Sequence, residues 1–332
     1  MPKVSVIIPC YNEESTIQFL LDALYSQTFP RHEMEVIIAD GISTDRTREV
    51  IAGFVHQNPD FVVRVIDNPK GTIPAALNYA IKAATGEFYV RMDAHSVPQP
   101  DYIERSVNAL DAGLGDNVGG VWKIRPGSGG SMAKAIAIAA AHPLGVGDAR
   151  YRVGGQAQVV DTVPFGAFSR DLIERIGMFD ETLLSNEDYE FNVRVRKAGG
   201  TIWMDPAIQI AYFARSNLRA LAHQYWRYGY WKLRMLLRYP DSFRWRQLSG
   251  AFVLGWVVLG SLSIWFSWAR WLLALAALLY SGILIVFAGI NAAREHQDSA
   301  LILTVPAAIA VMHFSWGTAF IYSLLKYVLS RK

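Results

Sequence analysis

Residues 87–96 read EFYVRMDAHS, and this stretch decides the fold of the 332-residue chain. It begins as a buried strand and changes abruptly to an arginine, an aspartate and a histidine. A near-continuous apolar run is typical of a strand in a mainly parallel sheet covered on both faces. Ligands bind such sheets beyond the carboxyl ends of the strands. The abrupt change therefore predicts both a parallel sheet and a ligand site at the end of this strand.

Earlier segments repeat the pattern of a β-branched run that ends in polar residues. Three of them are predicted strands, at 4–9, 35–40 and 63–68, and the strand quoted above is expected over 87–93. Stretches with helical spacing at 14–27, 44–57 and 72–85 separate them. Strands that alternate with helices predict right-handed βαβ units and an α/β fold class. The second helix is expected to be capped by Ser43 or Thr44 and the third to end at Gly86.

The last third of the chain has a different composition. Three hydrophobic segments are predicted at about 248–268, 271–290 and 299–328, and the first two contain no charged residue. Each of these two matches the roughly 20 residues needed to cross a bilayer as a helix, and tryptophans cluster at their ends. Buried core helices of a large soluble protein are the alternative, which the run length and lack of charge disfavour. The sequence therefore predicts transmembrane segments.

Three regions follow from these patterns: a soluble α/β head at 1–216, a basic aromatic interfacial region at 217–247, and a membrane domain at 248–332. The head is expected in the cytoplasm, because the amino terminus has too short an apolar run for a secretory signal and the single Cys10 fits a reducing compartment. The third segment contains Pro306 and is expected to be bent or partly embedded. Lys326, Arg331 and Lys332 favour a cytoplasmic carboxyl terminus.

Two polar groups at the predicted strand ends suggest chemistry. Asp93 and His95 lie two residues apart, so in an extended chain both side chains point to one side and can bind one cation. A carboxylate and an imidazole suit Mn²⁺ or Mg²⁺ held mainly by a substrate diphosphate. The alternative is a surface aspartate with a capping histidine. For Asp40, in an Asp-Gly pair, a simple turn is as good an explanation as a binding role.

Two further segments carry dense charge. In SNEDYEFNVRVRKAGG (185–200), acids precede bases along a predicted helix, which complements the helix dipole and has a purely structural explanation. In HQYWRYGYWKLRMLLRY (223–239), basic and aromatic residues alternate directly before the first hydrophobic segment. That composition is typical of an interfacial helix that contacts anionic lipid headgroups. The net charge of +3 is too small to indicate a nucleic-acid partner.

Taken together and in this order, the motifs resemble family 2 glycosyltransferases. They are VSVIIPCYNE, ADGISTDRT, NPKGTIPAALNYAIKAATGEF, RMDAHS, NEDYEFNVRVRKAGG and QYWRY, and the resemblance covers residues 3–240. It is closest to the ExoA-type branch, membrane-attached transferases of bacterial exopolysaccharide assembly of the succinoglycan type. The resemblance implies the nucleotide-binding GT-A fold and an inverting transfer.

The resemblance also implies roles for single residues. Asp93 stands at the first acid of the DxD metal motif, and His95 replaces the second. Asp188 matches the general base, with Glu187 as the competing candidate. Asp40 would accept a hydrogen bond from the base of the nucleotide. Pro9, Tyr11 and Glu13 would line the nucleotide pocket. Gln224, Arg227 and Tyr228 resemble a QxxRW signature on the acceptor or diphosphate side, in which Tyr replaces Trp.

The implied activity is a metal-dependent hexosyltransferase that uses Mn²⁺ or Mg²⁺. Its donor would be a nucleotide sugar, with a UDP-sugar favoured, and its acceptor a hydroxyl of a lipid-linked saccharide at the inner membrane. A processive polysaccharide synthase and a polyprenyl-phosphate sugar transferase remain alternatives. A non-catalytic sugar-nucleotide-binding scaffold is an alternative of a different class, against which the presence of Asp40, Asp93 and Asp188 together argues.

Overall fold

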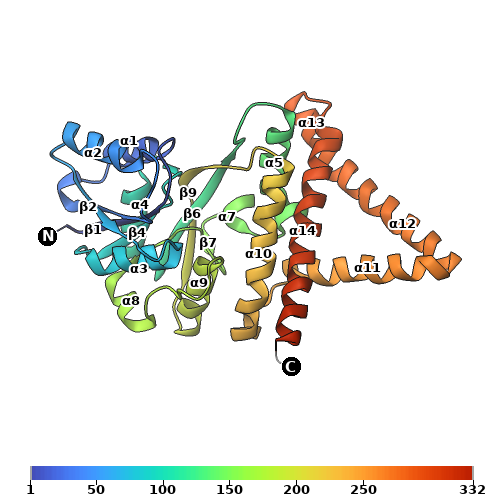
Figure 1. Cartoon of the computed structure of the whole chain (residues 1–332). Coiled ribbons are helices and arrows are strands. Elements are labelled where there is room, and N and C mark those ends of the chain that lie inside the picture. The colour runs from blue at the N-terminus through green and yellow to red at the C-terminus, as the bar shows by residue number, and fades with distance from the viewer. Residues whose placement is uncertain (1, 331–332) are drawn as a thin grey trace. The chain divides into compact units, whose positions relative to one another are not determined.

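The computed structural model describes residues 2–330, apart from the side chain of Arg246. Arg331 and Lys332, which entered the prediction for the carboxyl terminus, lie outside the described residues. By their contacts the residues form two compact units, and Figure 1 shows the elements of each. The sheet unit comprises residues up to 123 and residues 154–212, and the helical unit comprises residues 124–153 and those from 213 onward. Each unit is described by itself.

The first half of the sheet is parallel. Strands β1 (Val4–Cys10), β2 (Met34–Asp40), β3 (Val62–Asp67) and β4 (Phe88–Arg91) lie in the order β3-β2-β1-β4, and every pair is parallel. All residues of β1, β2 and β4 are buried, as the apolar runs predict. Because parallel strands end at the same edge, the loops after them are neighbours. Strand β4 ends at Arg91, two residues earlier than predicted.

The second half of the sheet is antiparallel, so the nine-stranded sheet is mixed. Strand β8 pairs antiparallel with both β4 and β6, and β9 pairs antiparallel with β5 and β7. These strands are short except for β6 and β9. Their bounds are β5 (Val97–Pro98), β6 (Asn117–Arg125), β7 (Gln158–Val159), β8 (Ala167–Ser169) and β9 (Ile202–Phe213).

Helices cover both faces of the parallel strands. Helices α1 and α2 lie on one face and α3 on the other (Figure 1), as alternating right-handed crossovers require. The stripe predicted for the first helix, with Ile17, Leu20, Leu21 and Leu24, is fully buried. The helices of the sheet unit, with the short 3₁₀ turn η1, are α1 (Ile17–Tyr25), η1 (Arg31–Glu33), α2 (Thr47–Gln57), α3 (Ile73–Ala83), α4 (Tyr102–Asp111), α8 (Arg170–Ile176) and α9 (Glu187–Lys197).

Two predicted helix ends were wrong. The residue before α2 is Arg46, whose side chain makes no capping bond, and the first helical amide, that of Thr47, donates to Asp45 Oδ1 at 3.0 Å. The Ser43 amide instead donates to the Asp40 carboxylate at the end of β2, and the Thr44 amide donates to the Asn12 side chain in the loop after β1. The third helix ends at Ala83, and Gly86 lies beyond it. A Cβ at Gly86 would lie 2.7 Å from the Ser5 amide nitrogen, so close strand packing explains this glycine.

The helical unit is built around α14 (Leu301–Leu329), a single continuous helix that contains Pro306. Helix α10 runs beside it (Figure 1), with the ring of Trp226 near that of Tyr322. By length and composition, Ser267–His296 and Leu301–Leu329 are long and apolar enough to cross a membrane. The remaining elements of this unit are α5 (Ser131–Ala141), α6 (Pro143–Val146), α7 (Arg150–Val153), α10 (Leu218–Arg238), η2 (Pro240–Ser242), η3 (Trp245–Gln247), α11 (Ser249–Trp265), α12 (Ser267–Leu284), the π-helical η4 (Ile285–Ile290) and α13 (Asn291–His296).

Candidate active site

The loops after β1 and β2 are bonded to each other at the carboxyl edge of the sheet. The Asn12 amide donates to the Ser43 hydroxyl oxygen at 2.9 Å, and the Thr44 amide donates to the Asn12 side-chain oxygen at 2.8 Å. The Glu13 amide donates to the Thr47 hydroxyl oxygen at 2.7 Å. The loops PCYNE and DGISTD follow two paired strands, and these bonds hold the two loops together. Together they form a pre-organised rim.

Asp40, the last residue of β2, is completely buried. Its carboxylate accepts from the Ser43 amide at 3.0 Å and from the Arg48 Nε at 2.5 Å. Arg48 also bonds the Asp67 carboxylate at the end of β3. The bonds from Ser43 are those of the local turn that the sequence left open for Asp40, and the bond from Arg48 adds a second, structural role. A carboxylate offers about four acceptor positions, so these bonds do not exclude a further one. The predicted bond from a nucleobase to Asp40 stays a prediction.

The end of β4 brings His95 to Glu13. The Ser96 amide donates to the Asp93 carbonyl at 3.0 Å, so residues 93–96 form a turn. The extended geometry expected for Asp93 and His95 was therefore wrong. His95 Nδ1 lies 2.9 Å from Glu13 Oε1. Burial by itself would raise the pKa of Glu13, but its hydrogen bonds to His95 and Thr16 outweigh burial and lower that pKa below its usual value.

The donor set at this turn fits a cation that takes most of its ligands from a diphosphate. Across residues 2–330, no group of three or more His, Cys, Asp or Glu side chains is placed to hold a metal ion. A carboxylate bonded to one imidazole nitrogen is, however, the usual support of a metal-binding histidine. The Glu13 contact at Nδ1 orients the His95 ring in that way. Asp93 is partly exposed beside it, with 23% of its side chain accessible.

Arg91 connects the end of β4 to the start of α9. Its Nη2 donates to Glu187 Oε1 at 2.8 Å and lies 3.4 Å from Asp93 Oδ1. Arg91 and Glu187 are 3% and 6% exposed. Although they are 96 positions apart in the sequence, their ion pair brings the acidic start of α9 to the carboxyl edge of the sheet.

The two neighbouring acids of α9 differ in environment. Burial raises the pKa of the Glu187 carboxyl, Arg91 opposes that rise, and nearby Asp188 adds to it. Asp188 is only partly buried, and its Oδ1 accepts from the Tyr189 amide at 2.7 Å. The helix runs from acids to bases and is followed by Gly199 with a φ of 78°, as predicted. Both acids thus lie at the first turn of α9.

Other predicted residues fall in different places. Pro9 is buried within β1, whereas Tyr11 is 54% exposed in the loop after it. Gln224, Arg227 and Tyr228 belong to α10 of the helical unit, where the Gln224 amide donates to the Tyr228 hydroxyl at 3.0 Å. Their predicted role on the acceptor side stays a prediction.

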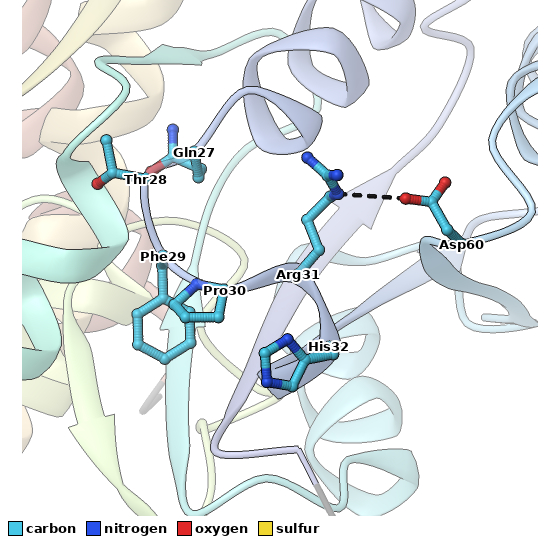
Figure 2. Close-up of a pocket in the computed structure, with 7 residues that line it drawn as sticks. All are labelled: Gln27, Thr28, Phe29, Pro30, Arg31, His32 and Asp60. Atoms are coloured by element: carbon cyan, nitrogen blue, oxygen red, sulfur yellow. Dashed lines mark ion pairs between the residues drawn. The ribbon is translucent and has the colours of Figure 1, made fainter.

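A surface pocket shown in Figure 2 lies at the opposite edge of the sheet from these acids. Its lining residues are Gln27, Thr28, Phe29, Pro30, Arg31, His32 and Asp60. Most of them directly precede β2, which begins at Met34 and ends at Asp40. An ion pair between Arg31 and Asp60, at 3.3 Å, closes one side. The strand-end acids do not line this pocket, so it is not the candidate site.

Two site residues were missed by the sequence analysis. Arg91 was quoted within RMDAHS but given no role, and Arg48 was treated only as part of a helix. A charged residue inside an otherwise apolar strand was the available signal for Arg91, because such a side chain is buried only with a partner. Nothing in the sequence pointed to Arg48, since its partners Asp40 and Asp67 end two different strands.

Comparison with known proteins gives a consistent assignment. A family model described as "Glycosyl transferase family 2" matches residues 5–177. The succinoglycan biosynthesis protein ExoA of Rhizobium meliloti is 30% identical over 97% of this chain and 95% of its own length. A protein of Methanococcus voltae named dolichyl N-acetyl-α-D-glucosaminyl phosphate 3-β-D-2,3-diacetamido-2,3-dideoxy-β-D-glucuronosyltransferase is 28% identical over 68% of this chain and 71% of its own length.

Solved structures share the fold at low sequence identity. The mannosyltransferase PcManGT of Pyrobaculum calidifontis, solved with GDP-Man and Mn²⁺, has a TM-score of 0.65 at 21% identity and covers 97% of this chain and 87% of its own. Residues 1–349 of TarS from S. aureus, solved with UDP-GlcNAc, have a TM-score of 0.54 at 18% identity over 98% of this chain and 92% of theirs. The mixed sheet with its helices is therefore a GT-A-type fold, as predicted.

Proposed function

Because the chain belongs to glycosyltransferase family 2, we propose that it is an inverting enzyme that transfers a sugar from a nucleotide sugar to a hydroxyl group. The observation that carries the proposal is the Arg91–Glu187 ion pair, 2.8 Å long. It holds the first turn of α9 at the sheet edge where Asp93 lies, so donor-side and acceptor-side carboxylates share one edge. One edge can then bind a diphosphate and deprotonate an acceptor.

The proposed donor site consists of the rim formed by the loops after β1, β2 and β4. Tyr11 offers an exposed ring to the base, and Pro9, Glu13 and Asp40 shape the pocket beneath it. A divalent cation held by Asp93 and His95 would neutralise charge on the leaving diphosphate. The structures of relatives with UDP-GlcNAc and GDP-Man support a nucleotide-sugar donor, and a UDP-sugar is our choice.

In the proposed reaction Asp188 is the general base. Its carboxylate takes the proton of the acceptor hydroxyl as the oxygen attacks the anomeric carbon. The bond from that carbon to the diphosphate oxygen breaks, and its electron pair leaves with the nucleoside diphosphate. A single displacement from the opposite face inverts the anomeric centre. Asp188 is preferred to Glu187 because Glu187 is 6% exposed and bonded to Arg91.

We place the enzyme at the inner membrane, with the sheet unit in the cytoplasm and a lipid-linked saccharide as its acceptor. Exposed apolar side chains on α11 and α12 support membrane attachment, and only 17% of the apolar part of Ser267–His296 is buried. The helices of this unit approach one another closely at glycines. A Cβ at Gly229 would lie 2.1 Å from the Trp316 carbonyl oxygen, and a Cβ at Gly317 would lie 2.5 Å from the Ser249 carbonyl oxygen. Close packing at small residues is typical of helices in lipid.

We assign the bilayer crossing to the α11–α12 hairpin and place α14 at the membrane surface. Helix α14 packs along α10, with Lys326 above the Tyr230 ring at 5.9 Å. Exposed arginines occur along the whole length of α10, at positions 219, 227, 234 and 238. A spanning α14 would carry these charges into the hydrocarbon, where each costs several kcal/mol. Both ends of the hairpin then lie on the cytoplasmic side.

The test is a screen of UDP- and GDP-sugars against the full chain in detergent, with and without Mn²⁺. We expect a thermal shift and slow release of nucleotide from one donor. Asp188→Asn should keep donor binding but lose on the order of 10²–10⁴ in rate, because it removes the general base. Asp93→Ala should abolish the Mn²⁺-dependent part of UDP binding. If Asp188→Asn transferred sugar at the wild-type rate and Glu187→Gln were inactive, the general base would be Glu187 and not Asp188.

A further inference from the structure

Arg91 is a buried cation that takes no part in the bond-making and bond-breaking steps proposed above. It ends β4, is 3% exposed, and lies between two aromatic rings, 5.8 Å from the centre of Phe165 and 5.9 Å from that of Phe179. Its Nε and Nη1 are buried without a hydrogen-bond partner. Burying a charge with unsatisfied donors opposes folding. The burial of Arg91 is therefore not explained by a contribution to stability.

The start of α9 is the element that depends on Arg91. Asn186 precedes the helix with a φ of 64°, in the left-handed region, and its side chain makes no capping hydrogen bond. Within the first turn, the Tyr189 amide donates to Asp188 Oδ1 at 2.7 Å, a bond that does not reach beyond the helix. The bond from Arg91 Nη2 to Glu187 Oε1 ties the first helical residue to the sheet instead. The position of Asp188, the next residue, then depends on that bond.

The same helix contains a second ion pair that serves as a reference. Arg194 bonds Glu190 through both Nε and Nη2, at 2.8 and 3.0 Å. It also donates to the carbonyl groups of Ile176, Gly177 and Met178 at the end of α8. This pair fastens α9 to α8, and its guanidinium contacts neither Asp93 nor Glu187. The two arginines thus hold the same helix at different points.

We infer that Arg91 is a positioning residue that divides the roles of the two neighbouring acids. It withdraws Glu187 into a buried ion pair and holds the first turn of α9 so that Asp188 alone acts as the base. Arg91 touches no reacting atom and acts through Glu187. The inference rests on the proposed function, since it names how that base is placed.

The test compares Arg91→Lys and Arg91→Met with Arg194→Lys and Arg194→Met in the full chain. All four should lower the melting temperature. Only the Arg91 variants should lose nucleotide release per folded molecule, by roughly 10²-fold, because a base displaced by about 1 Å loses that much. The dissociation constant for UDP with Mn²⁺ should change less than the rate. Glu187→Gln, whose amide oxygen still accepts from Arg91, should lose less of the rate than the Arg91 variants.

A second measurement needs no turnover. Carbodiimide labelling of carboxyl groups, read by mass spectrometry, should modify Asp188 and spare Glu187 in the wild type. Arg91→Lys should expose Glu187 to the reagent, and Arg194→Lys should not. Equal labelling of both acids in the wild type, or full activity of folded Arg91→Lys, would overturn the inference. A wild type that labels as expected but releases nucleotide from no donor would overturn the proposed function instead.

Discussion

The sheet unit and the helical unit treat charged and apolar side chains in opposite ways. The sheet unit buries Glu35, Arg91 and Glu187, and each of them has a partner of opposite charge. The helical unit instead exposes large apolar side chains, among them Leu278 at 70% and Trp271 at 78%. Exposed apolar side chains are unfavourable in water, whereas exposed charges are unfavourable in lipid. The difference fits the membrane attachment proposed for the helical unit.

The largest stability effect is expected where the sheet unit buries charge. Glu35 accepts from the Ser5 hydroxyl at 2.7 Å, the Thr85 amide at 2.6 Å and Arg64 at 2.8 Å. Glu35→Ala should cost about 3 kcal/mol, near the low end for a broken buried pair, because Arg64 can reach water. Glu35→Gln keeps an acceptor and should cost less. Pulse proteolysis of the full chain in urea measures both, and equal losses would remove the charge from the explanation.

A charged substitution on the apolar surface should have an effect of comparable size. Leu278→Arg, on α12, should cost roughly 2.5–3.5 kcal/mol if lipid surrounds this helix. The matched control is Phe19→Arg on α1, at 61% exposure, where water makes the change nearly neutral. The yield of folded, membrane-bound protein measures the difference. Similar yields for the two variants would end the contrast between the units.

Acid should weaken the buried network of the sheet unit. Burial alone would raise the pKa of Glu35, but hydrogen bonds from Ser5 and Thr85 and the charge of Arg64 lower it below its usual 4.5. The unfolded chain then binds a proton first, so the contribution of Glu35 is complete above pH 4.5 and is lost as the pH falls through its lowered pKa. Melting temperatures at descending pH should therefore fall more steeply for wild type than for Glu35→Gln. Parallel curves would contradict the assignment.

The smallest effect is expected for an exposed ion pair of the same unit. Lys3 and Asp111 are joined at 2.8 Å, but their side chains are 34% and 45% exposed. Asp111→Asn should cost roughly 0.2–1 kcal/mol, and 1 M salt should abolish the difference from wild type, because the pair is screened. A loss as large as that of Glu35→Ala would show that burial does not decide the value of charge in this unit.

Periodicity along the chain was enough to predict the parallel strands and the three helices between them. The apolar runs at β1, β2 and β4 and the stripe on α1 appear where expected, because period and composition are local properties. The apolar segments near the carboxyl terminus are helices for the same reason. None of the strands β5 to β9 was predicted, including the long strands β6 and β9. For β5, β7 and β8 the reason is that strands of two or three residues have too few side chains to show a period.

The candidate site could be predicted only as a set of residues. Asp40, Asp93 and the acids of α9 were chosen from motifs, and the structure brings some of them to one edge. The pairing of His95 with Glu13, 82 positions away, could not be predicted, nor could that of Arg91 with Glu187. No local pattern records a contact between distant segments.

By itself, the sequence determined the α/β class, the likeness to glycosyltransferases and the presence of long apolar helices. Each of these depends on residue type and spacing along the chain. Only the tertiary structure decided that residues 93–96 turn, that Arg91 is withdrawn between two rings, and that Glu187 rather than Asp188 forms the buried pair. The physical reason is that burial and charge pairing arise between segments, and chain order does not specify which partner removes a given charge from water.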